Sequence, residues 1–276
     1  MKKLLYLFSA TLLALASCTN DYDGSCVKKN DVNPIKNDTI SPPKTDSIPI
    51  VIMEPFLLKK LVHTYTNGEV STLELSYKDN KILSDRDGSN TTLYTYTGDV
   101  ITKIEKADLS GDVYLTKEYV YANGKVDYIL SNEFGNYYKT KYHYNSDGSV
   151  FYYKLNSDSL GTDGQDTGIS GRYTFSEGNL ITDQFYNGSY ESLITFEYDS
   201  KNNPRLNILG FNLLIDTNEM SSSNNIIKRI GDVEDSGTIM TTIFSHEYNE
   251  NGYPVKTTQT LQIGHVITKE TSTYSY

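Results

Sequence analysis

Three aspartates lie among glycines in the stretch NSDSLGTDGQDTGISG, residues 156–171. Calcium prefers several oxygen ligands from a flexible loop, which makes Asp158, Asp163 and Asp166 candidate ligands. However, their order departs from the Asp-x-Asp-x-Asp-Gly pattern, and no glutamate follows at the twelfth position, where a bidentate ligand would stand. We therefore interpret the stretch as a mobile acidic loop and predict no metal-ligating residue.

No catalytic motif is present in the chain. It contains no His-Glu-x-x-His, no Gly-x-Ser-x-Gly, no Walker loop and no dinucleotide fingerprint. The four histidines, His63, His143, His246 and His265, are dispersed, and none has a second histidine at metal-binding spacing. We interpret His246, which replaces an aromatic residue of a repeated pair, as a packed imidazole, and His143 as a solvated side chain. No catalytic or cofactor-binding residue is predicted.

Two ligand chemistries stay open. Paired carboxylates could hydrolyse a glycosidic bond, but the separation that matters is spatial, and the sequence selects no pair among its 35 acidic residues. The 24 tyrosines could line an exposed surface that stacks on sugar rings, although the chain has no tryptophan. The alternative is that these rings form the core.

A repeated unit explains the tyrosines better than a ligand site does. It consists of an aromatic residue, any residue, a second aromatic, a polar turn and an apolar strand, as in YVYANGKV at 119–126. In SLITFEYD, Ile194, Phe196 and Tyr198 share one face of a strand, while Thr195 and Glu197 share the other. We predict ladders of buried rings whose hydroxyls reach carbonyls or water near the strand ends. Other copies are LSYKDNKI (75–82), YTYTGDVI (94–101), YHYNSDGSV (142–150), YTFSEGNL (173–180), FEYDSKNNP (196–204), HEYNENGYP (246–254) and the half unit YSY (274–276).

The spacing of turn signals predicts an all-β antiparallel up-and-down meander. Each interval between copies holds a second turn signal, such as Phe134-Gly135, which gives two strands per unit and about 14 to 17 strands in total. Twisted open sheets rarely exceed ~10 strands, so the sheet should curve strongly or close into a barrel. The stretch 210–225 breaks the pattern and could hold a helical turn or a long loop, and the interval from Tyr198 to Tyr248 could hold one degenerate unit. We expect any ligand site where the repeat is broken, at 156–171 or 208–231.

The predicted strands are nearly long enough to cross a membrane, and the terminal Tyr276 resembles the aromatic end of outer-membrane barrels. However, charged residues fall on both faces, with Glu197 and Lys139 on one and Lys117 and Glu270 on the other. A lipid-facing band should be apolar throughout. We therefore predict a water-soluble sheet.

Residues 1–17 are predicted to be a lipoprotein signal peptide. A basic start and a short apolar run are typical of secretion signals, because a spanning helix needs ~20 apolar residues. Ala16-Ser17 before Cys18 resembles the lipobox of bacterial lipoproteins. That resemblance implies diacylglyceryl transfer to the Cys18 thiol, cleavage before Cys18 and acylation of the new amino terminus. The alternative is an ordinary signal peptide that is cleaved near Ala16.

Residues 18–50 are predicted to be a flexible tether, since Pro, Asn, Asp and Ser dominate and apolar residues are isolated. The acidic TNDYDG directly after Cys18 resembles the signal that sends Bacteroidota-type lipoproteins to the cell surface, and the alternative is a solvated linker. Cys26 has no intrachain partner once Cys18 is acylated, so no disulfide is expected. A formal net charge of −10 excludes nucleic acid as a partner. Residues 51–276 then form a single all-β domain.

The layout resembles a domain-of-unknown-function family of Bacteroidota lipoproteins that is described as having a porin-like fold. The similarity lies in the lipoprotein start, the Pro-rich tether, and the stretches YDSKNNP (198–204), SSNN (222–225) and YNENGYP (248–254). More distantly, the unit resembles the YD hairpin repeats of Rhs-type shells. The family has no established activity, so the resemblance implies a fold and no residue roles.

From these observations we predict a surface lipoprotein of the bacterial outer membrane, attached to the membrane through Cys18. It would serve as a non-enzymatic binding or structural module, with a glycan or an outer-membrane protein as its partner. The alternative is an envelope carbohydrate-active enzyme or glycan-binding protein with a carboxylate-lined or Tyr-lined cleft. Carboxylates that converge in a pocket with raised pKa values would favour the enzyme.

Overall fold

The structure, a computed structural model, describes residues 56–233 and 238–276. The predictions for the signal peptide at 1–17, for Cys18 and for the tether at 18–50 concern residues outside these ranges. Among the described residues, no helix is both long and apolar enough to cross a membrane.

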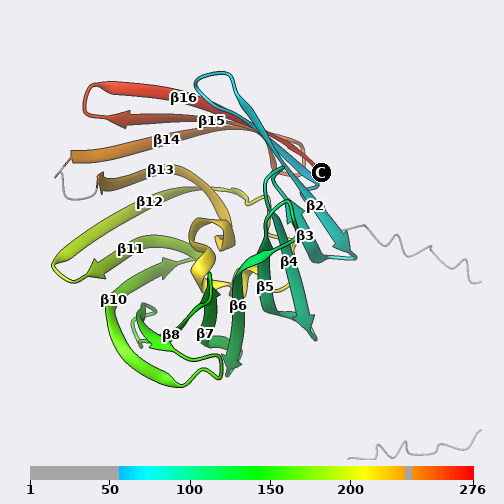
Figure 1. Cartoon of the computed structure of the whole chain (residues 1–276). Coiled ribbons are helices and arrows are strands. Elements are labelled where there is room, and N and C mark those ends of the chain that lie inside the picture. Colours follow the sequence, from blue (N-terminus) through cyan, green and yellow to red (C-terminus); the bar gives the residue numbers. More distant parts are fainter. Residues whose placement is uncertain (1–55, 234–237) are drawn as a thin grey trace, which may run out of the picture. The chain divides into compact units, whose positions relative to one another are not determined.

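Sixteen strands form one antiparallel sheet in which each strand pairs with its neighbours in the sequence, and the first pairs with the last (Figure 1). The sheet is therefore a closed barrel, which confirms the predicted all-β meander and decides between strong curvature and closure in favour of closure. The strands are β1 (Lys60–Thr64), β2 (Val70–Lys78), β3 (Lys81–Arg86), β4 (Thr91–Thr97), β5 (Val100–Ala107), β6 (Val113–Ala122), β7 (Lys125–Glu133), β8 (Asn136–Tyr144), β9 (Val150–Ser157), β10 (Asp163–Ser176), β11 (Asn179–Asn187), β12 (Tyr190–Asn202), β13 (Asn224–Val233), β14 (Thr238–Tyr248), β15 (Pro254–Ile263) and β16 (Val266–Ser275).

Most copies of the repeated unit contain a β-bulge next to their second aromatic residue, although the copy that ends at Tyr144 keeps a continuous register. Tyr121 lies opposite Val126, and the register shifts between Val120 and Tyr121. A bulge increases the local twist and bends the strand, which helps a sheet to curve. The same shift occurs before Tyr77, Tyr96, Phe175, Tyr198 and Tyr248. The unit therefore encodes curvature as well as a turn.

The tyrosine hydroxyls satisfy backbone carbonyls near the same end of the barrel, as predicted. Tyr144 donates to the carbonyl oxygen of Val126 over 2.9 Å, and Val126 itself is 1 % exposed. Burial raises the pKa of Tyr144 to about 12, so the hydroxyl keeps its proton at neutral pH. Equivalent bonds run from Tyr77 to Leu58, from Tyr121 to Ile101, from Tyr198 to Leu180 and from Tyr276 to Pro254.

The stretch 156–171 is not the loop that its glycines and aspartates indicated. Strand β9 continues to Ser157 and β10 begins at Asp163, so only a tight turn separates them. Asp158 stabilises this turn by accepting hydrogen bonds from the backbone N–H groups of Leu160 and Thr162. From Asp163 onward the residues pair with β9, with two register shifts. This pairing gives the segment its strand structure, and the amino-acid composition of the segment alone does not show it.

The break in the repeat lies between β12 and β13, where residues 203–223 leave the sheet. This segment, which we call the plug, contains the 3₁₀ helices η1 (Phe211–Leu213) and η2 (Ile215–Ser221). Of the helical turn and the long loop that the sequence left open, the structure has helical turns, and residues 224–231 belong to β13 rather than to the break. The prediction of a degenerate unit between Tyr198 and Tyr248 is wrong, because the plug accounts for the extra length.

Candidate binding cleft in the barrel lumen

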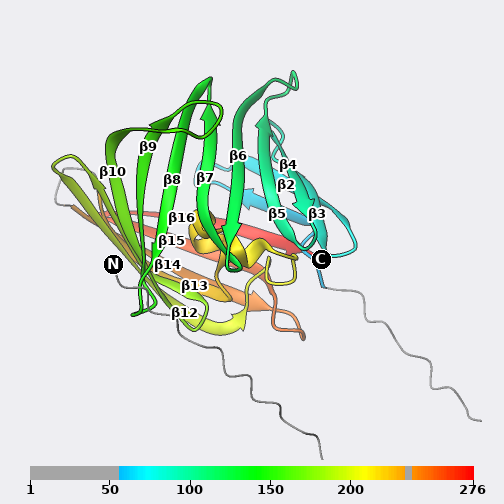
Figure 2. The same cartoon turned by 90° about the horizontal axis from the view of Figure 1, so that it is seen from below.

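The plug folds back into the barrel and packs against the inner face of the strands (Figures 1 and 2). Ile208, Phe211 and Leu214 are at most 2 % exposed and join the same core as the inward residues of the sheet. The backbone N–H of Leu209 donates to the carbonyl of Asn80, and the Tyr96 hydroxyl donates to the carbonyl of Leu209. Apolar anchors and backbone hydrogen bonds thus hold the plug at the end of the barrel where the bulges lie.

Gly210 allows this close approach. Its φ of 71° lies in the left-handed region, which glycine adopts without strain. A Cβ at this position would lie 2.7 Å from the carbonyl oxygen of Asp99 on a sheet hairpin. The backbone of the plug therefore touches the backbone of the barrel directly.

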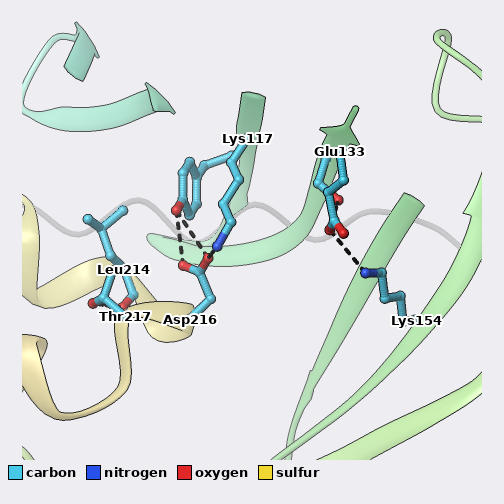
Figure 3. A network of polar contacts seen from close by, with 8 residues as sticks. Lys117, Glu133, Lys154, Leu214, Asp216 and Thr217 are labelled. Atoms are coloured by element: carbon cyan, nitrogen blue, oxygen red, sulfur yellow. Dashed lines mark hydrogen bonds and ion pairs between the residues drawn. The ribbon is translucent and has the colours of Figure 1, made fainter. Parts of the chain in front are cut away.

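Charged side chains on the inner face form two ion pairs, one with the plug and one between nearby strands. On β6, Lys117 lies two residues from the buried Tyr119 and so shares its inward face. The Lys117 ammonium lies 2.6 Å from the Asp216 carboxylate on η2, and the Tyr119 hydroxyl donates to the same carboxylate at 3.0 Å. Figure 3 shows Asp216 reaching from the plug toward Lys117.

A second pair, between Glu133 and Lys154, lies beside the first (Figure 3). Glu133 on β7 and Lys154 on β9 are 3.0 Å apart, and Ser131 donates a further hydrogen bond to the carboxylate. The Lys154 ammonium also lies 3.9 Å from the ring centroid of Tyr138, close enough for a cation–π contact. The lumen is therefore polar and internally neutralised on this side.

Between the plug and strands β2–β6 lies a cavity of about 280 Å³, which we call the cleft. The cleft reaches Asp87, an exposed residue in the turn between β3 and β4. Its wall combines apolar, aromatic and charged groups, a mixture typical of small-molecule sites. The polar lining includes Asp85, Tyr94, Lys106, Lys117, Arg205 and Asp216, and the apolar lining includes Leu73, Ile104, Phe211 and Met220.

The acids of the cleft are already engaged. Asp85 accepts a 2.6 Å hydrogen bond from the Tyr94 hydroxyl, and Asp216 is held by Lys117 and Tyr119. Backbone N–H groups of Ser89 and Asn90 donate to Asp87, and these bonds outweigh its slight desolvation and lower the pKa of its carboxyl. Asp183 is the one described carboxyl whose pKa is clearly raised, to about 6, and it does not line the cleft.

Arg205 stands out among the cations of the cleft. Its guanidinium carbon lies 5.2 Å from the ring centroid of Phe211, and its side chain also contacts the Tyr94 hydroxyl. A second cavity, of about 240 Å³, lies on the other side of the plug, and Arg205 and Met220 line both cavities. Arg205 therefore stands at the junction of the two halves of the open lumen.

The residues that the sequence singled out lie mostly outside the cleft. Asp163 pairs with Lys139 and Lys141 on the outer face, and the described residues contain no group of three or more possible metal ligands. His246 lines the second cavity, where it is packed between Thr257 and the carbonyl of Ile226, as expected. His143 is exposed, which agrees with its interpretation as a solvated side chain.

His63 is held in a network that spacing alone did not indicate. Its Nδ1 lies 2.9 Å from the Ser272 hydroxyl, and its Nε2 lies 3.1 Å from the Glu270 carboxylate. All three sit on paired strands, where His63 lies directly opposite Ser272. This pairing ties the two strands that close the barrel.

No family model and no curated protein matches this chain. Several solved structures resemble it, among them two crystal structures of porin-like proteins. One is a porin-like protein from Bacteroides vulgatus ATCC 8482, with a TM-score of 0.52, 16% identity, and coverage of 80% of this chain and 99% of that chain. The fold is porin-like. The other, a porin-like protein from Bacteroides uniformis ATCC 8492, has a TM-score of 0.50 and 12% identity, and covers 79% of this chain and 97% of that chain. At this identity the likeness concerns the fold alone.

Proposed function

We propose that this protein is a surface lipoprotein of the bacterial outer membrane whose water-soluble barrel binds a small polar solute or glycan in the lumen. The observation that carries the proposal is the cleft, where Tyr94, Arg205 and Asp85 converge on a cavity of about 280 Å³. Its volume is close to the lower end of the ~300–1,000 Å³ that ligand pockets usually have. A monosaccharide or a chain end fits this size better than a long polymer.

The outward face supports the water-soluble part of the proposal. Ion pairs lie along it on adjoining strands, such as Lys228 with Glu197 and Lys256 with Glu247. A charged side chain at the bilayer midplane costs about 2–4 kcal/mol when it is Lys or Arg, so a lipid-facing band would exclude these residues. Attachment through an acylated Cys18 is the remaining route to the membrane in this proposal.

The plug and the acids argue against two other functions. Buried contacts of Phe211 and Leu214 fill the barrel at one end, which does not suit a diffusion pore. A glycosidase needs an acid whose pKa is raised, but Asp87 in the cleft has a lowered pKa. Binding without turnover therefore fits the cleft better than hydrolysis.

The anchor and the ligand require separate experiments. Growth with labelled palmitate, followed by isolation of the chain, should show label on the wild type and none on Cys18→Ser. Label on both proteins, or on neither, would contradict lipidation at Cys18.

For the ligand, the full chain in detergent should be screened on a broad glycan array, with a detergent blank. The test variant is Tyr94→Ala, which removes a ring from the cleft. Its matched control is Tyr153→Ala, which removes a ring from the opposite face of the sheet. We expect signals that Tyr94→Ala abolishes and Tyr153→Ala retains. An array without any signal would refute the binding proposal for glycans.

A further inference from the structure

Arg205 is a partly buried cation without an acidic partner among the described residues. No carboxylate there lies within 4.0 Å of its guanidinium, whereas Lys117 and Lys154 in the same lumen both have one. Charges taken out of water are normally paired, because desolvation costs several kcal/mol when nothing compensates. The polar contact of the guanidinium is with the Tyr94 hydroxyl.

The acids of the cleft form no direct ion pair with Arg205. Asp216 is bound by Lys117 and Tyr119, and Asp85 is bound by Tyr94. Lys106 lies close enough to Asp87 to help lower the pKa of that carboxyl. The lining thus has three acids and three cations. The neutral Tyr94 hydroxyl links Asp85 to Arg205 without bringing the two charges into direct contact, so no carboxylate of the lining occupies the guanidinium fork.

The position of Arg205 is well suited to ligand recognition. The Phe211 ring, 2 % exposed, supports one side of the guanidinium, and the backbone N–H of Arg205 donates to Asn203. A guanidinium that is stacked on a ring keeps its N–H fork available for a planar, two-oxygen acceptor. Both cavities beside the plug are lined by this residue, so the fork can be reached from either.

We propose that Arg205 binds the carboxylate of an acidic saccharide, such as a uronic acid residue, in the cleft. This inference rests on the proposed binding function and adds the chemical class of the ligand. A single carboxylate matches the planar fork of one guanidinium, and Asp85 and Asp87 repel its one negative charge less than the two charges of a phosphate. The hydroxyl groups of the sugar would meet Thr92, Thr217 and the free lone pairs of Asp85 along the same wall.

The test compares sugars that differ only in the carboxylate. Calorimetry on the full chain in detergent would use oligosaccharides of glucuronate and galacturonate beside the glucose and galactose oligomers, with inorganic phosphate as a separate probe. A bidentate charge-assisted pair should make the acidic member of a pair bind about tenfold tighter or more. Raising the salt concentration should weaken this binding.

Two variants locate the effect. Arg205→Gln should lose about tenfold or more in affinity for the acidic sugar, and Arg205→Lys should recover only part of it, because an ammonium lacks the fork. Arg172→Gln is the matched control, since Arg172 pairs with Asp147 outside the cleft. Circular dichroism and the melting temperature of each variant show that the barrel is intact.

The outcomes separate the inference from the function on which it rests. The inference is supported if the protein binds acidic sugars more tightly than neutral ones, and if Arg205→Gln weakens this binding while Arg172→Gln does not. Equal affinity for acidic and neutral sugars, preference for inorganic phosphate, or an unaffected Arg205→Gln variant would overturn it and leave the binding function standing. If no saccharide of either kind binds, this inference and the glycan form of the binding proposal both fail.

Discussion

Replacing Asp216 by alanine removes the carboxylate that ties the plug to strand β6. Two groups lose their partner in this variant, the Lys117 ammonium at 2.6 Å and the Tyr119 hydroxyl at 3.0 Å. Aspartate usually lies on the surface, but the side chain of Asp216 is only 12% exposed. Water therefore reaches this position poorly and cannot fully replace the lost carboxylate as a hydrogen-bond partner. The plug should remain in the lumen, because Phe211 and Leu214 stay buried, but the folded state should be less stable.

The two lost contacts differ in weight. Tyr119 is 4 % exposed, and a buried hydroxyl that loses its only partner costs about 1–3 kcal/mol. Lys117 is 31% exposed and can turn toward water, so its ion pair contributes about 0.2–1 kcal/mol. We therefore expect Asp216→Ala to lower the free energy of unfolding by about 2–3 kcal/mol, which for a domain of this size lowers the melting temperature by roughly 4–12 °C.

Urea unfolding of the full chain in detergent, followed by tyrosine fluorescence and far-ultraviolet circular dichroism, measures this loss. Asp216→Asn is the matched control, because its amide oxygen still accepts from Tyr119 while the charge is gone, and it should cost about 1 kcal/mol. A double-mutant cycle with Lys117→Met isolates the ion pair. If Asp216→Ala is as stable as the wild type, the plug is not held through this carboxylate and the reasoning is refuted.

Three further substitutions test other parts of the barrel. Tyr144→Phe should lower the free energy of unfolding in urea by about 0.5–1.5 kcal/mol, because the Val126 carbonyl loses its donor. The control is Phe175→Leu, which removes a ring without a hydroxyl and leaves every such hydrogen bond in place. Asp183 has a pKa raised to about 6 by burial, against the opposing charge of Arg229, so the folded state binds its proton more tightly than the unfolded state does. Stability should therefore fall as pH rises from about 4 to 6, and Asp183→Asn should flatten this slope; parallel pH profiles for both proteins would contradict the assignment. Gly171→Ala places a Cβ 2.4 Å from the Tyr152 ring and 2.5 Å from a backbone oxygen, so we expect a loss of about 1–3 kcal/mol on thermal melting, and an unchanged melting temperature would show that the strand shifts freely.

The sequence predicts the barrel well because the repeated unit encodes local geometry. Tyr121 and Val126 with the turn between them specify a hairpin and a bulge, and the Tyr121 hydroxyl bonds to the carbonyl of Ile101 in the preceding unit, so each bond joins neighbours in chain order. Repeating this unit around the chain also predicts strong curvature or closure, since twisted sheets with so many strands rarely stay open. The strand order needs nothing beyond chain order.

The cleft could not be predicted in the same way, because its residues come together only through closure. Lys117 and Asp216 are far apart in sequence, and nothing in the spacing shows that η2 enters the lumen. The one signal was that Lys117 shares a strand face with aromatic residues, which marks a charge inside the barrel. Likewise, the aspartates of 156–171 resembled a loop because their pairing partner, β9, is not visible in composition.

The plug explains why this barrel combines a polar lumen with a packed core. Sixteen-stranded barrels are wide enough to leave an aqueous channel when their side chains alone line the interior. Here residues 203–223 occupy one end of the barrel. Ile208, Phe211 and Leu214 of this segment pack against the inward apolar side chains of the strands. The inward charges farther along the strands find counter-charges on the plug or on each other, as Lys117 does with Asp216. Arg205 lies on this same segment and forms no ion pair among the described residues, so the plug also supplies the candidate recognition group of the cleft.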